Sequence, residues 1–304
     1  MRKIFFLLPA AFTFVQALVN AQNPADWETR IRGYADEFGG RVGLAAKSLT
    51  TGETIAVQAD TLFPTASVIK LPVLVELFHQ FQEGKLKPEQ PISLSTETSV
   101  PGDGVLRFFH QGQTLQLRDI ATLMIILSDN TATNYVIDQL GGAHDEKLEA
   151  VNNRMRALGL KNTKLLNKLY SLKTKKNTEE ARRFGIGVSS PADMVLLLEK
   201  LVRGEVVNKP VSDEIIAILK NQMDKSQAAR FLPFAEDTTL WIANKTGSLD
   251  DRKIDVGIVS SAKGSYVYAI FCDNSTDLGE QPDNMATLAV AKISRLLYET
   301  FMKK

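Results

Sequence analysis

The stretch "PTASVIKLPVL" (residues 64–74) is an apolar run with a lysine, Lys70, in its middle. The residues around Lys70 are expected to enter a core, where an ammonium group is costly unless it has a partner or a lowered pKa. Ser67 stands three residues earlier, so the two side chains share one face of a helix. If that helix starts near Ser67, its free amides favour negative charge there. The stretch therefore predicts a core helix with a serine–lysine pair at its N-terminal end.

A serine–lysine pair at this spacing suggests nucleophilic chemistry, because a partly desolvated lysine can accept the proton of a nearby hydroxyl. The spacing alone is a weak signal. Residues 260–263 ("SSAK") repeat it at the end of a strand-like run, where the two side chains would not face each other. Further motifs are needed to decide between chemistry and packing.

The order of predicted elements along the chain indicates the fold. Strand patterns lie on either side of Thr51-Gly52 and again after residue 238, whereas residues 65–222 are mainly helical. One helix is marked by Ser190-Pro191 at its start and by Gly204 at its end. Helical patterns open and close the mature chain, at residues 26–38 and 284–301.

We therefore expect an α/β (α+β) fold, in which one antiparallel sheet is built from both chain ends and flanked by terminal helices. An all-helical subdomain would be inserted into it. The expected division is a signal peptide at 1–21 and a single catalytic domain at 22–304. Within that domain, 22–64 and 223–304 would form the sheet subdomain and 65–222 the helical subdomain.

Two further motifs stand at places that matter for chemistry. Ser128-Asp129-Asn130 lies between an apolar segment and a helical one, and Lys245-Thr246-Gly247 ends a strand-like run. Each has a simple structural explanation, since Ser, Asp and Asn are preferred helix caps and a Thr-Gly pair suits a turn. Together with the serine–lysine pair, in this order and in these contexts, they form the signature of penicillin-recognising serine enzymes.

The sequence thus resembles the class A β-lactamase-like family over almost the whole mature chain. The segments "ASVIKLPVLVELF", "LSDNTATNYVIDQLGG" and "NKTGSLDD" carry the likeness most specifically. The resemblance implies a catalytic set of Ser67 as nucleophile, Lys70 as its base or proton relay, and Ser128 as proton donor to the leaving nitrogen.

The resemblance also implies roles in substrate binding. Asn130 would bond the acyl-amide, Lys245 would supply positive charge near Ser128, and Thr246 with Ser248 would meet the substrate carboxylate. The backbone amides of Ser67 and Ser248 would form an oxyanion hole. No metal or organic cofactor is implied, and we expect a monomer.

One part of the family pattern is missing. Class A β-lactamases carry a glutamate in a Glu-x-x-Leu-Asn motif that activates the deacylating water. Here the nearest match begins at Thr163, and a second register would place Leu169 there; neither can act as a base. Residues 150–178 contain no Asp or Glu, so Glu179 and Glu180 are the first candidates to replace it. The alternative is that Glu179 and Glu180 are solvent-exposed carboxylates beside two arginines and have no role in the site.

The first residues of the chain resemble a targeting segment. Two basic residues precede an apolar stretch at 4–19, and small residues follow it, as in a secretory signal peptide. A membrane anchor is the alternative, but the stretch is short for a span and contains a proline and a glutamine. We expect export to the periplasm or the medium, with no membrane attachment after cleavage.

The remaining composition excludes several classes. The formal net charge of +1 falls to −1 without Arg2 and Lys3, which gives no support for a nucleic-acid partner. The single cysteine, Cys272, cannot form an internal disulfide and is expected to be a small buried hydrophobe. Three scattered histidines provide neither metal-ligand spacing nor a histidine-based triad.

Three functions remain open from the sequence. The first is a serine hydrolase that opens β-lactam rings. The second is an enzyme with the same serine site that acts on peptidoglycan-like stems (a D,D-peptidase) or on esters. The third is a penicillin-binding sensor module in which a lasting acyl-enzyme is the signal. The resemblance implies that a loop at 101–106 ("PGDGVL") borders the cleft and influences substrate choice; the alternative is a simple turn-rich connector.

Overall fold

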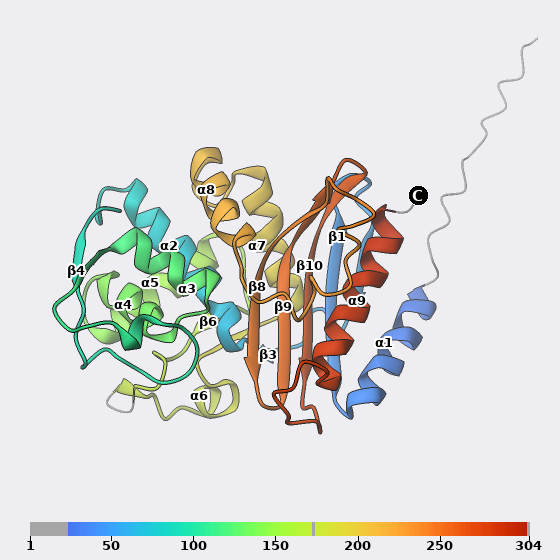
Figure 1. The fold of residues 1–304 in the computed structure, drawn as a ribbon, viewed down its shortest axis with the longest axis horizontal. Coiled ribbons are helices and arrows are strands. Elements are labelled where there is room, and N and C mark those ends of the chain that lie inside the picture. Colours follow the sequence, from blue (N-terminus) through green and yellow to red (C-terminus); the bar gives the residue numbers. More distant parts are fainter. Residues whose placement is uncertain (1–23, 172–173, 303–304) are drawn as a thin grey trace, which may run out of the picture.

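The computed structural model describes residues 24–171 and 174–302, so the expected signal peptide lies outside the described residues. Its main sheet has the antiparallel order β2-β1-β10-β9-β8 (Figure 1). These strands are β1 (Arg41–Ser48), β2 (Thr54–Val57), β8 (Trp241–Leu249), β9 (Arg252–Ser261) and β10 (Gly264–Asp273). The expectation of one antiparallel sheet from both chain ends is confirmed.

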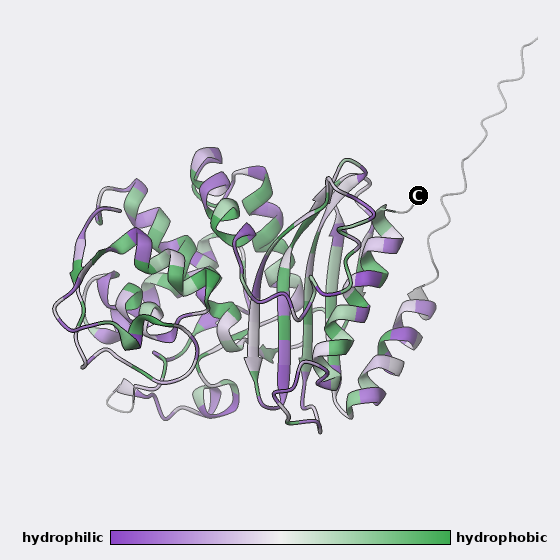
Figure 2. Cartoon of the chain, viewed as in Figure 1, coloured by the Kyte–Doolittle hydropathy of each residue, from purple (hydrophilic) through white to green (hydrophobic). Residues whose placement is uncertain are grey.

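Both faces of this sheet are covered by helices. The helices α1 (Pro24–Phe38) and α9 (Met285–Met302) cover one face, and α7 (Pro191–Arg203) packs on β1 and β10 from the other (Figure 1). Side chains of β10 alternate accordingly: Tyr268 packs toward the terminal helices, whereas Ala269 joins the second core. In Figure 2 the strands carry long hydrophobic stretches, while α1 is largely hydrophilic on its outer side.

The second half of the molecule is built mainly from helices. It contains η1 (Ala66–Ile69), α2 (Lys70–Gln82), η2 (Leu106–Phe108), α3 (Leu117–Ile126), α4 (Asn130–Gln139), α5 (His144–Ala157), α6 (Glu179–Phe184) and α8 (Lys209–Lys220). Ten of the thirteen residues of α2 are buried, so this helix is the centre of the half. No helix of the described residues is long and apolar enough to cross a membrane.

The expectation of an all-helical insertion needs a correction. Two short sheets lie in this region: β3 (Phe63–Pro64), β7 (Gly187–Ser189) and β6 (Lys164–Leu165) form one, and β4 (Pro91–Ser93) pairs with β5 (Thr114–Gln116) in the other. Residues 114–116, within the stretch that was expected to be mainly helical, pair as a strand instead. The helix α7 also covers the sheet, although it lies within the stretch assigned to the helical subdomain.

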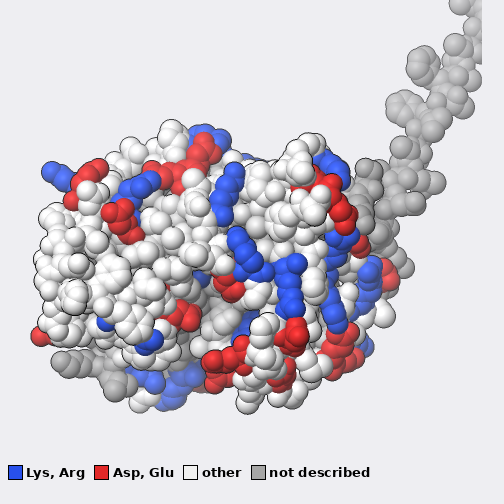
Figure 3. Space-filling view, in the orientation of Figure 1, with Lys and Arg blue, Asp and Glu red and all other residues white. Residues whose placement is uncertain are grey.

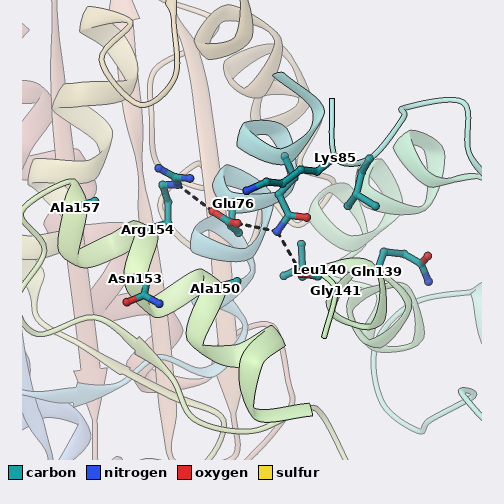
Figure 4. A pocket seen from close by; sticks show the side chains of 11 residues that line it. Glu76, Lys85, Gln139, Leu140, Gly141, Ala150, Asn153, Arg154 and Ala157 are labelled. Carbon is teal, nitrogen blue, oxygen red and sulfur yellow. Dashed lines mark hydrogen bonds and ion pairs between the residues drawn. The ribbon is translucent and has the colours of Figure 1, made fainter. Parts of the chain in front are cut away.

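A buried ion pair fixes α2 against α5. Glu76, which is 4% exposed, accepts a hydrogen bond from Arg154 Nε at 2.9 Å and one from Gln80 Nε2 at 2.8 Å (Figure 4). Gln80 also donates to the carbonyl of Leu140, at the C-terminal end of α4, at 3.3 Å. These groups border a groove of about 510 Å³ between the three helices. The contacts hold α2 and α4 together at their C-terminal ends, and both helices begin at the site described next.

Candidate active site

The floor of the site is the turn from β3 into α2. Ala66 adopts φ +43°, a left-handed conformation that is costly for a residue with a side chain, and Ser67 follows it at the start of the helical segment. The strand β8 runs directly alongside. A Cβ atom at Gly247 would lie 3.0 Å from Thr65 O and 3.3 Å from Ser67 N, so only glycine fits there comfortably. The amides of Ser67 and Ser248 are thereby brought to the same region.

Lys70, the lysine of the opening stretch, is fully buried. Its Nζ donates to Asn130 Oδ1 at 2.8 Å, to Ser128 Oγ at 3.2 Å and to the Ser128 carbonyl. Its side-chain hydrogen bonds among the described residues go to the Ser128–Asn130 turn rather than to Ser67. The buried ammonium expected from the sequence therefore has polar partners that lie 58 and 60 positions away in the chain.

The turn that carries Ser128 is held by its own neighbours. Ser128 has φ +54°, and Asp129 caps α4 by accepting a hydrogen bond from Ala132 N at 2.8 Å. The other carboxylate oxygen of Asp129 accepts from the amides of Val105 and Leu106. The motif is thus both a helix cap and a clamp on the 101–106 loop, so its structural and its chemical explanations are compatible.

Two ammonium groups converge on one hydroxyl. Lys245 is fully buried on β8 and donates to Ser128 Oγ at 3.0 Å and to the Thr246 carbonyl at 2.7 Å. Because Lys70 donates to the same oxygen, both acceptor positions of the Ser128 hydroxyl are used and its proton remains free for a third group. This arrangement suits a hydroxyl that donates its proton to another group.

Burial changes the acid–base properties of both lysines. Desolvation, reinforced by the nearby Lys245, holds the pKa of Lys70 well below its ordinary value, against the opposing pull of Asp103 and Asp129. Desolvation also lowers the pKa of Lys245 to about 8. The lowered pKa favours the neutral form of Lys70, which can accept a proton, whereas Lys245 with its pKa of about 8 stays mostly charged at pH 7.

A pocket of about 940 Å³ opens above these groups. Ser67, Asn130 and Ser248 line it, and most of the remaining wall comes from residues 102–103, 167–171, 182–186, 249–250, 252–253 and 279–282. Ser248 Oγ accepts from Gln227 Nε2 at 3.2 Å, and Thr246 is buried two positions earlier on β8. Figure 3 shows basic and acidic side chains gathered at the lower edge of the face, around α6 and the loops below the sheet.

The structure also distinguishes the two registers considered for the missing glutamate. Thr163 is buried away from the pocket, where its hydroxyl meets Ser189 Oγ and Asp193 Oδ2 at 2.8 Å each. Leu169 lines the pocket, and its amide and carbonyl are both bonded to the side chain of Asn134, at 3.0 and 2.9 Å. The alignment that places Leu169 at the position of the glutamate is therefore the one that reaches the pocket.

The two replacement carboxylates lie elsewhere. Glu179 is exposed, and Glu180 pairs with Lys164 at 2.8 Å; neither lines the pocket. The solvated-pair interpretation describes them better than a fold-back toward Ser67. The acidic residues that do line the pocket among the described residues are Asp103, Asp250 and Glu280.

Sequence reasoning missed several residues that shape the site. Asp103 influences Lys70 electrostatically, Asn134 holds Leu169, and Tyr170 borders the pocket. A signal for Asn134 was present, because it stands four residues after Asn130 and so lies on the same helix face. Asp103 belongs to the loop at 101–106 that was expected to border the cleft, whereas nothing in the local sequence marked Tyr170.

Two further features of the sequence have the following places in the structure. The second serine–lysine repeat lies at the turn between β9 and β10, far from the pocket lining. Cys272 is buried, and burial raises the pKa of its thiol. No cluster of metal-ligating side chains occurs within residues 24–171 and 174–302.

Comparison with known proteins agrees with this geometry. The model of the beta-lactamase enzyme family matches residues 26–301. A β-lactamase of Bacteroides uniformis is 24% identical, with 98% of this chain and 99% of that protein covered. The crystal structure of a β-lactamase from Sphaerobacter thermophilus is 28% identical with a TM-score of 0.78, covering 90% of this chain and 96% of that one.

A second structural relative is PBP-A, which is 27% identical with a TM-score of 0.77, covering 92% of this chain and 97% of that one. Its L158E mutant, solved as an acyl-enzyme complex with penicillin G, is 26% identical. Since the family model spans residues 26–301 and the matched structures share the whole fold, the chain belongs to the β-lactamase enzyme family, as a serine hydrolase of the class A type.

Proposed function

We propose that the protein is an exported serine hydrolase that opens β-lactam rings through an acyl-enzyme on Ser67 and releases the acyl group slowly. The observation that carries the proposal is the convergence of Lys70 and Lys245 on Ser128 Oγ, together with Ser67, which stands three residues before Lys70 and lines the same pocket as Asn130. It supplies a base, a proton carrier and a positive charge around one hydroxyl nucleophile, which is what acyl transfer to serine requires.

Acylation would proceed in two steps, attack on the carbonyl and loss of the leaving nitrogen, with three proton transfers in all. Ser67 Oγ attacks the lactam carbonyl while neutral Lys70 takes its proton, and the amides of Ser67 and Ser248 stabilise the oxyanion. When the carbon–nitrogen bond breaks, Ser128 gives its proton to the leaving nitrogen and is reprotonated by Lys70. Both steps use groups whose contacts support these roles: Lys70 donates to Ser128, and Gly247 packs against the Ser67 amide.

Substrate binding is assigned to the groups that surround the nucleophile. Asn130 would bond the acyl-amide, and Thr246 and Ser248 would bind the substrate carboxylate. The positive charge of Lys245, one residue from Thr246, would favour that carboxylate.

Deacylation is proposed to be slow because neither alignment places a carboxylate at the position of the family's glutamate. Leu169 occupies the pocket wall and cannot accept a proton, whereas Glu179 and Glu180 do not line the pocket. Water would then attack the acyl-enzyme without a positioned base, which removes a contribution of about 10²–10⁴-fold.

A second candidate is a D,D-peptidase or esterase with the same site. The pocket volume of about 940 Å³ leaves room for such substrates. A sensor module ranks third. Export to the periplasm or medium is part of the proposal and rests on the targeting pattern of residues 1–21.

The test uses purified mature protein from residue 22 onward, mixed with benzylpenicillin and followed by intact-protein mass spectrometry beside a nitrocefin stopped-flow assay. We expect a burst and a long-lived adduct that is absent in Ser67→Ala. Rapid sustained turnover would overturn the slow release but keep the β-lactamase. No adduct with any β-lactam would overturn the assignment of Ser67.

A further inference from the structure

Tyr170 has an unusual backbone. Its φ is +50°, a left-handed conformation that is an outlier for a bulky residue. The preceding residue, Leu169, is fixed at both its amide and its carbonyl by Asn134. Asn167 is fixed too, because it donates to Gly185 O at 2.8 Å and accepts from Lys176 N at 2.8 Å. The loop therefore holds Tyr170 in a conformation that the tyrosine itself does not favour.

Packing of the Tyr170 side chain contributes little to the stability of this conformation. It is 59% exposed and lines the pocket, so burial of its ring cannot compensate for the strain. Strained residues that persist without a packing reason cluster at ligand-binding sites. The position thus presents an aromatic ring to the pocket.

The ring stands beside Asn130. A Cβ atom at Gly102 would come within 2.4 Å of Asn130 Nδ2, 3.4 Å of Tyr170 Oη and 3.5 Å of Tyr170 Cε2. Both side chains therefore converge on the same glycine, which also has φ +90°. Asn130 Nδ2 itself donates to Pro101 O at 3.1 Å, which fixes the amide relative to this loop.

From this geometry we propose that Tyr170 is a specificity-determining residue that stacks on a planar apolar substituent of the substrate's acyl chain. The inference rests on the proposed function, in which Asn130 bonds the acyl-amide. Whatever is attached to that amide must then pass close to the Tyr170 ring. Aromatic groups gain from offset or edge-to-face contact with such a ring, so aryl-substituted acyl groups are the preferred class.

The test compares two β-lactams with the same ring system. Benzylpenicillin carries a phenylacetyl amide, whereas 6-aminopenicillanic acid has a bare amino group there. Second-order acylation rate constants of Ser67 are measured by mass spectrometry for wild type, Tyr170→Ala and Tyr170→Phe. The matched control is Phe108→Ala, because Phe108 is 71% exposed but does not line the pocket.

We expect Tyr170→Ala to slow acylation by benzylpenicillin about 3- to 10-fold and to leave 6-aminopenicillanic acid within about 2-fold. Tyr170→Phe should behave as wild type, and so should Phe108→Ala. If Tyr170→Ala fails to fold, Tyr170→Gly serves instead, because glycine adopts positive φ without strain.

The outcomes separate this inference from the proposed function. An equal loss for both compounds, or no loss for either, overturns the role of Tyr170 while the acyl-enzyme on Ser67 stands. Absence of acylation in the wild type by both compounds overturns the proposed function itself. A purely structural role of Tyr170 would not change the ratio of the acylation rate constants for the two compounds.

Discussion

Replacement of Gly247 by alanine tests how the site is assembled. The new Cβ would lie 3.0 Å from Thr65 O and 3.3 Å from both Ala66 Cβ and Ser67 N. Ordinary contacts begin at about 3.5 Å, so β8 and the Ser67 turn must separate by roughly 0.5 Å. The turn cannot easily yield, because Thr65 N donates to Gly187 O at 3.0 Å.

That displacement acts on the two amides that would bind the oxyanion. A misplacement of about 1 Å can cost about 10²-fold, and loss of one oxyanion donor about 10²- to 10³-fold. We therefore expect acylation of Ser67 in Gly247→Ala to slow by about 10- to 100-fold. Overpacking should cost about 1–3 kcal/mol of stability, which corresponds to a Tm decrease of about 2–10 °C.

The assay is the acylation rate with benzylpenicillin at a temperature well below the Tm of both proteins, with circular dichroism as the check of folding. The matched control is Gly33→Ala in α1, where a Cβ would meet nothing within 4 Å. That variant should acylate normally and gain about 0.5–1 kcal/mol of stability. A folded Gly247→Ala protein that acylates at the wild-type rate would refute the claim that this glycine sets the distance between the amides.

Three more predictions concern charge in the core and the pocket. Leu169→Glu should place a base in the pocket and shorten the lifetime of the Ser67 adduct at least 10-fold, as followed by mass spectrometry; an unchanged lifetime would contradict the register assigned to Leu169. Because the pKa of Lys245 is lowered to about 8, acylation should fall above pH 8, and Lys245→Arg should abolish that alkaline decline in the pH–rate profile. Burial raises the pKa of Asp255 to about 7, so the folded protein keeps a proton that the unfolded chain loses near pH 4. The free energy of unfolding should then fall by up to about 4 kcal/mol between about pH 4 and 7. Urea unfolding at pH 5 and 7.5 should show a smaller change in this free energy for Asp255→Asn than for the wild type.

Much of the fold could be predicted from local patterns. Ser190 caps α7 by accepting from Asp193 N, and Gly204 ends that helix in the left-handed conformation, as their residue types indicated. The hairpin around Thr51-Gly52 also forms as expected. The short strand at 114–116 was missed because its partner, residues 91–93, lies outside any local window.

The candidate site was predictable in its members but not in its contacts. Ser67, Lys70 and Ser128 were identified by motif, and the geometry brings Lys70 and Lys245 onto one hydroxyl. A three-residue spacing describes one helix face and contains no information on a second segment packed against it. It therefore could not predict that Lys70 bonds the Ser128 turn rather than Ser67.

By itself the sequence determined the order of strands and helices, the motif residues and the absence of acidic residues from 150–178, because these depend on residue identities and on interactions within a few positions. Only the tertiary structure decided that Leu169 rather than Thr163 reaches the pocket and that Tyr170 faces Gly102. It also decided the lowered pKa of both lysines. Desolvation and contact between segments up to 117 positions apart arise from packing of the whole chain, and no local pattern contains them.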